Sequence, residues 1–351
     1  MKKFLALLLA LVLVLSLAAC GQAGSGSSVP ESSSAAAEPT PAPESESEAE
    51  PVEPASYSIA GLKGPTTMGM VKLMDDAEQG LYDNTYTVTM YGAADEIVPL
   101  LSKGELDMAA APANLAATLY QKLEGKVQVA AVNTLGVLYV VTTGNVEVTS
   151  VADLAGKTVY STGKGTTPEY ALNYILTQNG LDPAKDLTIE YKSEATEVLS
   201  AMQTAGDAVA VLPQPYVTTA QMQVEGLKVA LDLTEEWNKV SPDSALVTGV
   251  LLARTDVIEA NPAAFDQFLA DYQASIEWVN ANTADAAQLI AKYEIVPKAE
   301  VAEKALPACN ITWLAGSEMK DKLSGYLQTL YDQDPASVGG AMPDDGFYYG
   351  A

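Results

Sequence analysis

The chain of 351 residues carries 45 Asp and Glu against 19 Lys and Arg, a formal net charge of −26, with no histidine and two cysteines. This acidity argues against a DNA- or RNA-binding function, because a phosphate backbone would repel the chain. Without histidine, a Ser-His-Asp triad and a His-rich metal site are excluded, and two cysteines cannot build a zinc cluster or a disulfide framework.

The N-terminus has the form of an export signal. Two lysines precede an apolar run over 4–17, and two alanines stand directly before Cys20. The apolar run is too short to be a comfortable membrane span. The sequence LAAC, which ends at Cys20, resembles the lipobox of bacterial lipoproteins and implies a signal peptide over 1–19 and a diacylglyceryl group on the Cys20 thiol. A signal peptide without a lipid is the alternative.

The segment over 20–55 is a tether. After Cys20 it consists almost entirely of Gly, Ser, Ala, Pro and Glu, with no Lys or Arg. Such a composition buries almost no apolar surface, and its like charges and prolines favour an extended, disordered chain. An acidic tail that recruits a basic partner is the alternative, but a spacer between an anchor and a domain explains position and composition together.

From Ser56 onward, short β-rich runs alternate with amphipathic helical stretches, a pattern typical of α/β proteins. Strands are expected over 57–60, 85–91, 106–111, 157–160, 187–191, 208–212 and 246–253. Helices are expected over about 70–81, 97–101, 114–123, 168–176, 198–202, 262–282 and 284–293, with another from near residue 318. Asn114 and Thr167 are expected to cap their helices, with Pro168 at a first helical position.

Local chemistry recurs at a constant separation along this α/β part. The paired positions, each 101 residues apart, are Lys63 and Lys164, Gly64 and Gly165, Thr66 and Thr167, and Pro112 and Pro213. The strand, loop and helix order around the two sets also matches. The repeat therefore predicts two related lobes.

Several segments, taken in order over about 56–282, resemble the extracytoplasmic solute-binding proteins of ABC importers. These segments are GELDMA (104–109), VADLAGKTV (151–159), GKGTT (163–167), NGLDP (179–183) and GDAVA (206–210). The nearest branch resembles the nitrate, sulfonate, taurine and thiamine-precursor group. No single motif is diagnostic, but their order is.

This resemblance implies an α/β fold of the type II periplasmic-binding kind, with two lobes and a ligand cleft between them. Lobe 1 would comprise 56–141 plus 249–351, and lobe 2 would comprise 147–241. The crossovers between the lobes would lie near 142–146 and 242–248. Members of the family close on their ligand by a hinge motion, and the closed form docks on the permease.

Helix N-termini at strand ends that face the cleft offer unpaired N–H groups to a ligand. Two such starts, Gly64–Thr67 and Gly165–Pro168, are expected, one in each lobe. Lys63 and Lys164 flank them and are candidates for binding an anionic head; two solvated lysines beside turns are the alternative. The candidate ligand-binding residues are Lys63, Gly64, Thr66, Thr67, Pro112, Asn114, Lys164, Gly165, Thr166, Thr167, Gln214 and Tyr216.

Gln214 and Tyr216 belong to this set by resemblance, because relatives often place a polar or aromatic contact at these positions. Relatives commonly carry an acidic residue before Pro-Tyr, whereas this chain has Gln214, which leaves the charge of the ligand open. Loop capping without ligand contact is the alternative for Pro112, Asn114, Gln214 and Tyr216.

These features together indicate the substrate-binding lipoprotein of an ABC importer, which captures a small anionic or heteroaromatic solute and is not an enzyme. Its partners would be the permease, the permease's ATPase and the outer face of the cell membrane, through Cys20. We expect a monomer without cofactor, metal or nucleic acid. A lipid-anchored sensor of an extracellular ligand is one alternative. An extracellular enzyme on the same fold is the other, although no base and nucleophile can be named.

Overall fold

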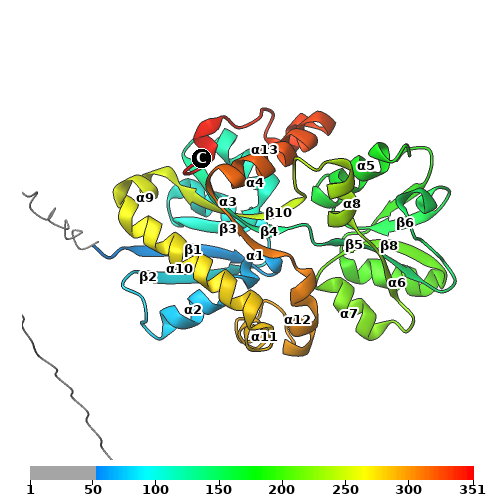
Figure 1. Ribbon diagram of the computed structural model, residues 1–351, viewed down its shortest axis with the longest axis horizontal. Coiled ribbons are helices and arrows are strands. Elements are labelled where there is room, and N and C mark those ends of the chain that lie inside the picture. The colour runs from blue at the N-terminus through cyan, green and yellow to red at the C-terminus, as the bar shows by residue number, and fades with distance from the viewer. Residues whose placement is uncertain (1–52) are drawn as a thin grey trace, which may run out of the picture. The chain divides into compact units, whose positions relative to one another are not determined.

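The computed structural model describes residues 53–351 of the chain. The expected signal peptide over 1–19, Cys20 and the tether up to residue 52 lie outside these residues. Two separate β-sheets, each covered by helices, divide the described part into two lobes (Figure 1).

Sheet 1, in lobe 1, has six strands in the order β11-β4-β10-β3-β1-β2. These strands are β1 (Ser56–Leu62), β2 (Thr85–Tyr91), β3 (Met108–Pro112), β4 (Val127–Leu135), β10 (Val247–Arg254) and β11 (Ile311–Leu314). β1 is parallel to β2 and β3, whereas β10 is antiparallel to β3 and β4. The three alanines of β3 are buried, as expected for a central strand covered on both faces.

The helices of lobe 1 come from both ends of the described chain. They are α1 (Pro65–Met68), α2 (Val71–Glu78), α3 (Ala94–Lys103), α4 (Ala113–Lys122), α9 (Thr255–Ala260), α10 (Pro262–Ala281), α11 (Thr283–Lys292), α12 (Ala299–Ala305) and α13 (Gly316–Gln333). Three short 3₁₀ turns accompany them: η2 (Leu306–Ala308), η3 (Pro335–Val338) and η4 (Asp345–Phe347).

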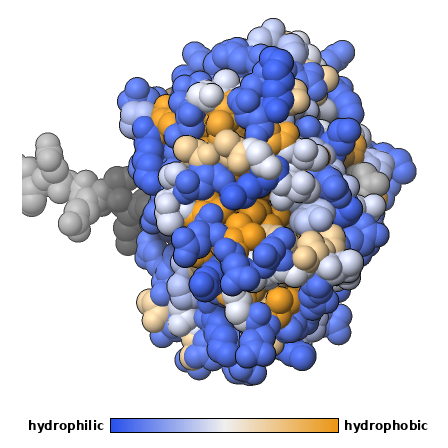
Figure 2. All heavy atoms as spheres, turned by 90° about the vertical axis from the view of Figure 1, so that its right-hand side faces the viewer, coloured by the Kyte–Doolittle hydropathy of each residue, from blue (hydrophilic) through white to orange (hydrophobic). Residues whose placement is uncertain are grey.

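Sheet 2, in lobe 2, has five strands in the order β7-β6-β8-β5-β9. These strands are β5 (Leu138–Thr143), β6 (Thr158–Ser161), β7 (Thr188–Tyr191), β8 (Ala208–Pro213) and β9 (Lys228–Asp232). The helical segments of lobe 2 are η1 (Val151–Leu154), α5 (Thr167–Gln178), α6 (Ala195–Ala205), α7 (Tyr216–Gln223) and α8 (Leu233–Val240). Seen from the lobe 2 end, the surface is mostly hydrophilic, with apolar residues gathered near its centre (Figure 2).

The two sheets share one topology. In each, a first strand lies between two parallel partners, β2-β1-β3 in sheet 1 and β7-β6-β8 in sheet 2. The third of these strands then pairs antiparallel with a strand that enters from the other lobe: Pro112 of β3 lies opposite Gly249 of β10, and Pro213 of β8 lies opposite Leu138 of β5. The two lobes predicted from the 101-residue repeat are therefore related in their backbone.

The chain first changes lobes earlier than the sequence suggests. β5 pairs with β8 and β9 of sheet 2, so residues 138–141, expected in lobe 1, belong to lobe 2. The crossover expected near 142–146 is therefore wrong, and the connection consists of Gly136 and Val137. The physical reason is that β5 is a fully buried strand that needs a partner on each side. The second connection is 241–246, because Val247 and Thr248 already belong to β10.

Two helices start one residue before their expected ranges. α4 begins at Ala113 and α5 at Thr167, so Asn114 lies inside its helix, and Thr167 does too. The N-cap positions are Pro112 and Thr166, and neither makes a side-chain capping bond. Thr167 does not cap because its hydroxyl accepts a hydrogen bond from the hydroxyl of Tyr326, in α13, at 3.1 Å.

The apolar core of lobe 1 continues into lobe 2 through α13. Trp237 of α8 is fully buried, with its ring centroid 5.7 Å from that of Tyr326 in α13 and 4.7 Å from that of Tyr174 in α5. Its indole N–H donates to the hydroxyl of Ser244 at 2.9 Å. Trp237 therefore belongs to the packing between the lobes, and its ring is not free to stack on a solute.

Gly136 marks a close approach of three segments. A Cβ built there would press on the hydroxyl of Thr234 and lie 2.7 Å from Cδ2 of Leu246. We predict that Gly136→Ala lowers the free energy of unfolding by about 1–3 kcal/mol, because the core must shift to admit the methyl group. Denaturant unfolding measures this change. Gly92→Ala is the control, since its nearest neighbour, Oε1 of Glu96, lies at 3.4 Å; equal losses in both variants would contradict the prediction.

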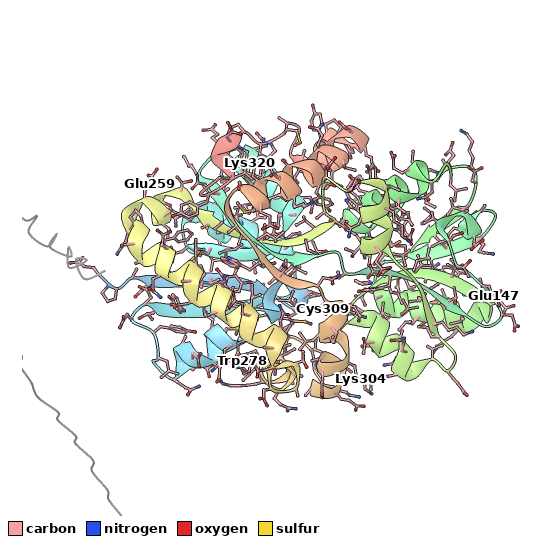
Figure 3. The ribbon with its side chains drawn as sticks, in the orientation of Figure 1. Glu147, Glu259, Trp278, Lys304, Cys309 and Lys320 are labelled. Carbon is pink, nitrogen blue, oxygen red and sulfur yellow. The ribbon has the colours of Figure 1, made fainter. Side chains whose placement is uncertain are left out.

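Cys309 lies where the two lobes meet (Figure 3). It is fully buried, and burial raises the pKa of its thiol to about 12. The carbonyl before it, that of Ala308, accepts a hydrogen bond from the Tyr139 hydroxyl of lobe 2 at 2.8 Å.

The Cys309 thiol should be inert in the folded protein, since the reactive thiolate is rare and reagents cannot reach it. In a Cys20→Ser background, we expect no labelling by Ellman's reagent at pH 8 until denaturant unfolds the chain, and then one thiol per chain. Rapid labelling of the native protein would show that this part of the lobe contact opens readily.

Candidate functional site

The two sheets turn the same kind of edge toward each other. Gly136 and Val137 are the whole connection between β4 and β5, so the Cα atoms of Leu135 and Leu138 are at most about 11 Å apart. Leu138 lies opposite Pro213, the last residue of β8. The carboxyl ends of the parallel strands, where α/β folds bind ligands, therefore face each other across this connection. We call the facing edges the interlobe junction.

On the lobe 1 side, the junction includes Thr66 of α1. A Cβ at Gly249 would lie 2.5 Å from Cγ2 of Thr66 and 2.6 Å from Oδ1 of Asn133, so Gly249 lets these two side chains meet over β10. Asn133 donates to the Tyr272 hydroxyl at 3.2 Å and accepts from Thr134 at 3.0 Å. Thr66 and Pro112 are thus brought together, because Pro112 lies opposite Gly249.

Thr67, the next residue of α1, is fully buried, and its hydroxyl has no hydrogen-bond partner among the described residues.

The first turn of α1 contains no acidic side chain, and the same holds for α4 and α7. The helix starts next to the central strands of both lobes therefore carry no negative side chain of their own.

On the lobe 2 side, Gln214 is fixed to the connection itself. Its backbone N–H donates to the carbonyl of Val137 at 2.9 Å. Its side-chain Oε1 accepts from the N–H of Thr218 at 3.3 Å and from the Thr218 hydroxyl at 2.9 Å. Gln214 thus caps α7 with its oxygen. Tyr216, at the start of α7, is 43% exposed and keeps ring surface available for a solute.

The start of α5 is already occupied by protein groups. The N–H of Gly165 donates to Oε2 of Glu169 at 2.5 Å, and the Thr166 hydroxyl donates to the carbonyl of Gly163 at 2.7 Å. The Thr167 hydroxyl is engaged by Tyr326 of lobe 1. The start of α5 therefore faces lobe 1, and the N–H groups of Gly165 and Thr166 and the hydroxyl of Thr167 already have protein partners.

The two candidate lysines are both exposed. Lys63 has its ammonium 3.9 Å from a carboxylate oxygen of Glu294. Lys164 lines a hollow of about 520 Å³ between α5 and the end of α13, together with Glu169 and Asp334. Neither lysine is buried at the junction, which is the arrangement that two solvated lysines beside turns would have.

Four residues at the junction are not among those predicted from the sequence: Asn133, Thr134, Asn310 and Tyr326. The Asn310 amide donates to the carbonyl of Gly136 at 2.5 Å, and its own carbonyl accepts from the N–H of Leu135 at 3.0 Å. Its φ of 47° is a left-handed conformation, which asparagine tolerates better than most residues. The one local signal that could have predicted this conformation is that an asparagine stands directly before a short β-rich run.

Tyr170 and Asp334 close the α13 side of the junction. The Tyr170 hydroxyl donates to Oδ2 of Asp334 at 3.1 Å, and burial together with this bond raises the Tyr170 pKa to about 12. Gln333 adds a bond to the carbonyl of Tyr170 at 3.1 Å. The lobes are therefore held together on this side by specific polar contacts as well as by the packing of Trp237.

A cavity of about 490 Å³ lies at the opposite edge of sheet 1, beside Lys103, Lys126 and Arg254. The Arg254 guanidinium is paired with Asp256, with Nε 3.0 Å from Oδ1, and packs over Gly104 at the end of α3. Cations near a helix C-terminus interact favourably with its unpaired carbonyls. The basic residues around this cavity therefore have a structural role, and we do not assign a ligand site to it.

Within residues 53–351, no three or more His, Cys, Asp and Glu side chains are grouped as a metal site would require. Over the same range, every helix is too short or too polar to cross a bilayer. The side chains at the junction are hydroxyls, amides and aromatic rings, a set suited to holding a small molecule by hydrogen bonds and ring contact.

Solved structures share this fold. An ABC transporter protein from Parabacteroides distasonis matches with a TM-score of 0.70 and 23% identity, over 84% of this chain and 98% of that chain. The periplasmic aliphatic sulphonate-binding protein SsuA from Escherichia coli matches with 0.68 and 19%, over 84% and 92%. The periplasmic nitrate-binding protein NrtA from Synechocystis PCC 6803 matches with 0.55 and 14%, over 82% and 82%. The chain therefore has the two-lobed, type II periplasmic-binding fold.

No curated protein matches the chain. A family model described as menaquinone biosynthesis matches residues 77–312, which run from α2 in lobe 1 through all of lobe 2 to β11. Because this match covers more than half of the sequence, the chain belongs to the family of that description.

Proposed function

We propose that this protein captures a small solute between its lobes and delivers it to an ABC importer. The observation that carries the proposal is the two-residue connection, which sets the carboxyl edges of two related sheets against each other. The similarity in fold to sulphonate- and nitrate-binding proteins supports it. Small backbone rotations at Gly136–Val137 and at 241–246 would change the distance between the lobes.

The junction offers a solute both polar and ring contacts. A neutral hydrogen bond contributes about 0.5–1.5 kcal/mol and micromolar binding requires about 8 kcal/mol, so burial of the solute's apolar surface must supply much of the affinity. In this proposal, polar contacts come from the hydroxyls of Thr66 and Thr67 and from the side-chain nitrogen Nε2 of Gln214. The ring of Tyr216 adds an aromatic contact. These four residues form the binding set that we propose, with Pro112 and Asn114 shaping its lobe 1 wall.

The description of the family favours one second candidate, an enzyme built on this fold. Such an enzyme needs a base, and the buried tyrosines nearest the junction are poor ones. Burial raises the pKa of Tyr139 and of Tyr326, which keeps both protonated at neutral pH. Solute capture therefore fits these residues better. Chemical change of a bound solute on incubation with purified protein would instead support the enzyme.

The binding set can be tested at its exposed member. A thermal-shift screen of sulfonates, nitrate, pyrimidines and vitamins identifies a solute that raises Tm, and calorimetry gives its Kd. We expect Tyr216→Ala to weaken binding by about 2- to 13-fold, since a ring contact is worth about 0.5–1.5 kcal/mol. Met222→Ala, on the same helix with the same 43% exposure, should leave the Kd unchanged. Equal losses in both variants would remove Tyr216 from the set.

We also propose that a lipid on Cys20 holds the protein at the outer face of the cell membrane. Two or more acyl chains anchor a protein stably, whereas one is marginal. Mass spectrometry of membrane-extracted protein should show loss of residues 1–19 and a diacylglyceryl mass on Cys20. Cys20→Ala should abolish both the added mass and the membrane association, and Cys309→Ala should retain them. A chain that stays membrane-bound without Cys20 would contradict this anchor.

A further inference from the structure

The helix α13 belongs to lobe 1 but contacts lobe 2 at two places (Figure 1). At the first, the ring of Tyr326 packs on that of Trp237 in α8, with 5.7 Å between the ring centroids. At the second, Oδ2 of Asp334 accepts from the hydroxyl of Tyr170 in α5 at 3.1 Å, and Nε2 of Gln333 donates to the Tyr170 carbonyl at 3.1 Å. The two contacts differ in burial and in distance from the connections between the lobes.

The first contact is apolar and lies beside the second connection, 241–246. A Cβ built at Gly325 would lie 2.7 Å from Cβ of Ser244, so α13 packs directly on this connection. The indole N–H of Trp237 donates to the Ser244 hydroxyl at 2.9 Å. Trp237 and Tyr326 are both fully buried. A rotation of lobe 2 about the connection therefore moves this contact little, and breaking it would expose two large rings.

The second contact is polar and far from the connection. At a rise of about 1.5 Å per residue, Asp334 lies about 12 Å farther along α13 than Tyr326. The hollow of about 520 Å³ lies between α5 and α13 here, and its lining is polar or charged apart from Gly165, so separation of the two helices exposes little apolar surface. A lobe rotation of about 15° across the axis of α13 would shift Asp334 by about 3 Å relative to Tyr170, more than a hydrogen bond tolerates.

The two partners of this distant bond are each fixed within their own lobe. Oδ1 of Asp334 accepts from the N–H of Ala336 at 3.0 Å, which ties the carboxylate to η3, and Val338 of η3 is fully buried in lobe 1. Tyr170 is only 8% exposed, and burial raises its pKa to about 12, so its hydroxyl stays a donor at neutral pH. A fixed donor and a fixed acceptor meet in one arrangement of the lobes only.

Resting on the hinge motion of the proposed function, we infer that α13 is a strap that controls closure of the lobes. The packing of Tyr326 on Trp237 is its pivot, and the bond between Tyr170 and Asp334 is a latch that forms only when the lobes are closed. The latch raises the closed fraction of molecules. The apparent affinity for a solute that binds the closed lobes rises in the same proportion, although the strap lies outside the proposed binding set.

Opening of the lobes can be measured directly, without a solute. In a Cys20→Ser background, spin labels are attached at Lys122→Cys on α4 and Thr177→Cys on α5, two exposed positions in different lobes on helices that pack against α13. Pulsed electron paramagnetic resonance gives the distribution of distances between the labels. We expect Tyr170→Phe and Asp334→Asn each to raise the population of a longer distance, relative to the wild-type distance, at least tenfold, since a hydrogen bond to a charged group is worth about this factor or more.

Two comparisons separate a latch from a general loosening of the fold. Asp334→Asn keeps Oδ1 for the N–H of Ala336 but replaces the oxygen that accepts from Tyr170. The double variant Tyr170→Phe/Asp334→Asn should therefore open no further than either single variant, because all three lose the same bond. Tyr349→Phe is the matched control, since the Tyr349 hydroxyl donates to Oδ1 of Asp266 at 2.8 Å within lobe 1, and it should keep the wild-type distance.

Three results would overturn the latch and leave solute capture intact: wild-type distances in Tyr170→Phe and Asp334→Asn, equal opening in Tyr349→Phe, or additive opening in the double variant. Failure of every solute in the thermal-shift screen would instead count against solute capture, while the label distances still decide whether the latch exists.

Discussion

The shortness of the link between β4 and β5 is the constraint on which the rest of the molecule depends. With only Gly136 and Val137 between two buried strands, the lobes stay adjacent at this link, and the same edge of each sheet must face the other. The carbonyls of both residues are used as acceptors, Gly136 by Asn310 and Val137 by Gln214. The connection is thereby fixed to both lobes, and its glycine is required by the close approach of Thr234 and Leu246.

The sequence predicts the two-lobed α/β architecture because the repeat falls on structural equivalents. Pro112 and Pro213 end corresponding strands, and Lys63 and Lys164 follow corresponding strands. It does not predict the first lobe boundary. From Val127 to Thr143 the chain reads as one β-rich run, and a glycine with an ordinary backbone conformation gives no turn signal.

The candidate site is only partly predictable, because side-chain pairing is decided by neighbours in space. Thr66 and Gln214 both lie at the junction, yet the side-chain oxygen of Gln214 accepts hydrogen bonds from Thr218 of α7. The bond from Glu169 to the start of α5 has a local sequence signal. Thr166 is followed three residues later by Glu169, which is the spacing of a capping box. The hydrogen bond from Tyr326 to Thr167 has no local sequence signal, since 159 residues separate the two. Contacts of this kind can be identified only once the fold is known.

The position of β10 has a consequence for how the chain reaches its native state. β10 lies between β3 and β4, so the middle of sheet 1 comes from residues that follow the whole of lobe 2. In sheet 2 the equivalent strand, β5, comes first. As the chain emerges from N- to C-terminus during synthesis, sheet 2 can assemble on an existing template, whereas sheet 1 must wait with β3 and β4 unpaired along their inner edges. Distant pairings form slowly, so lobe 2 should mature first and lobe 1 should set the pace of folding.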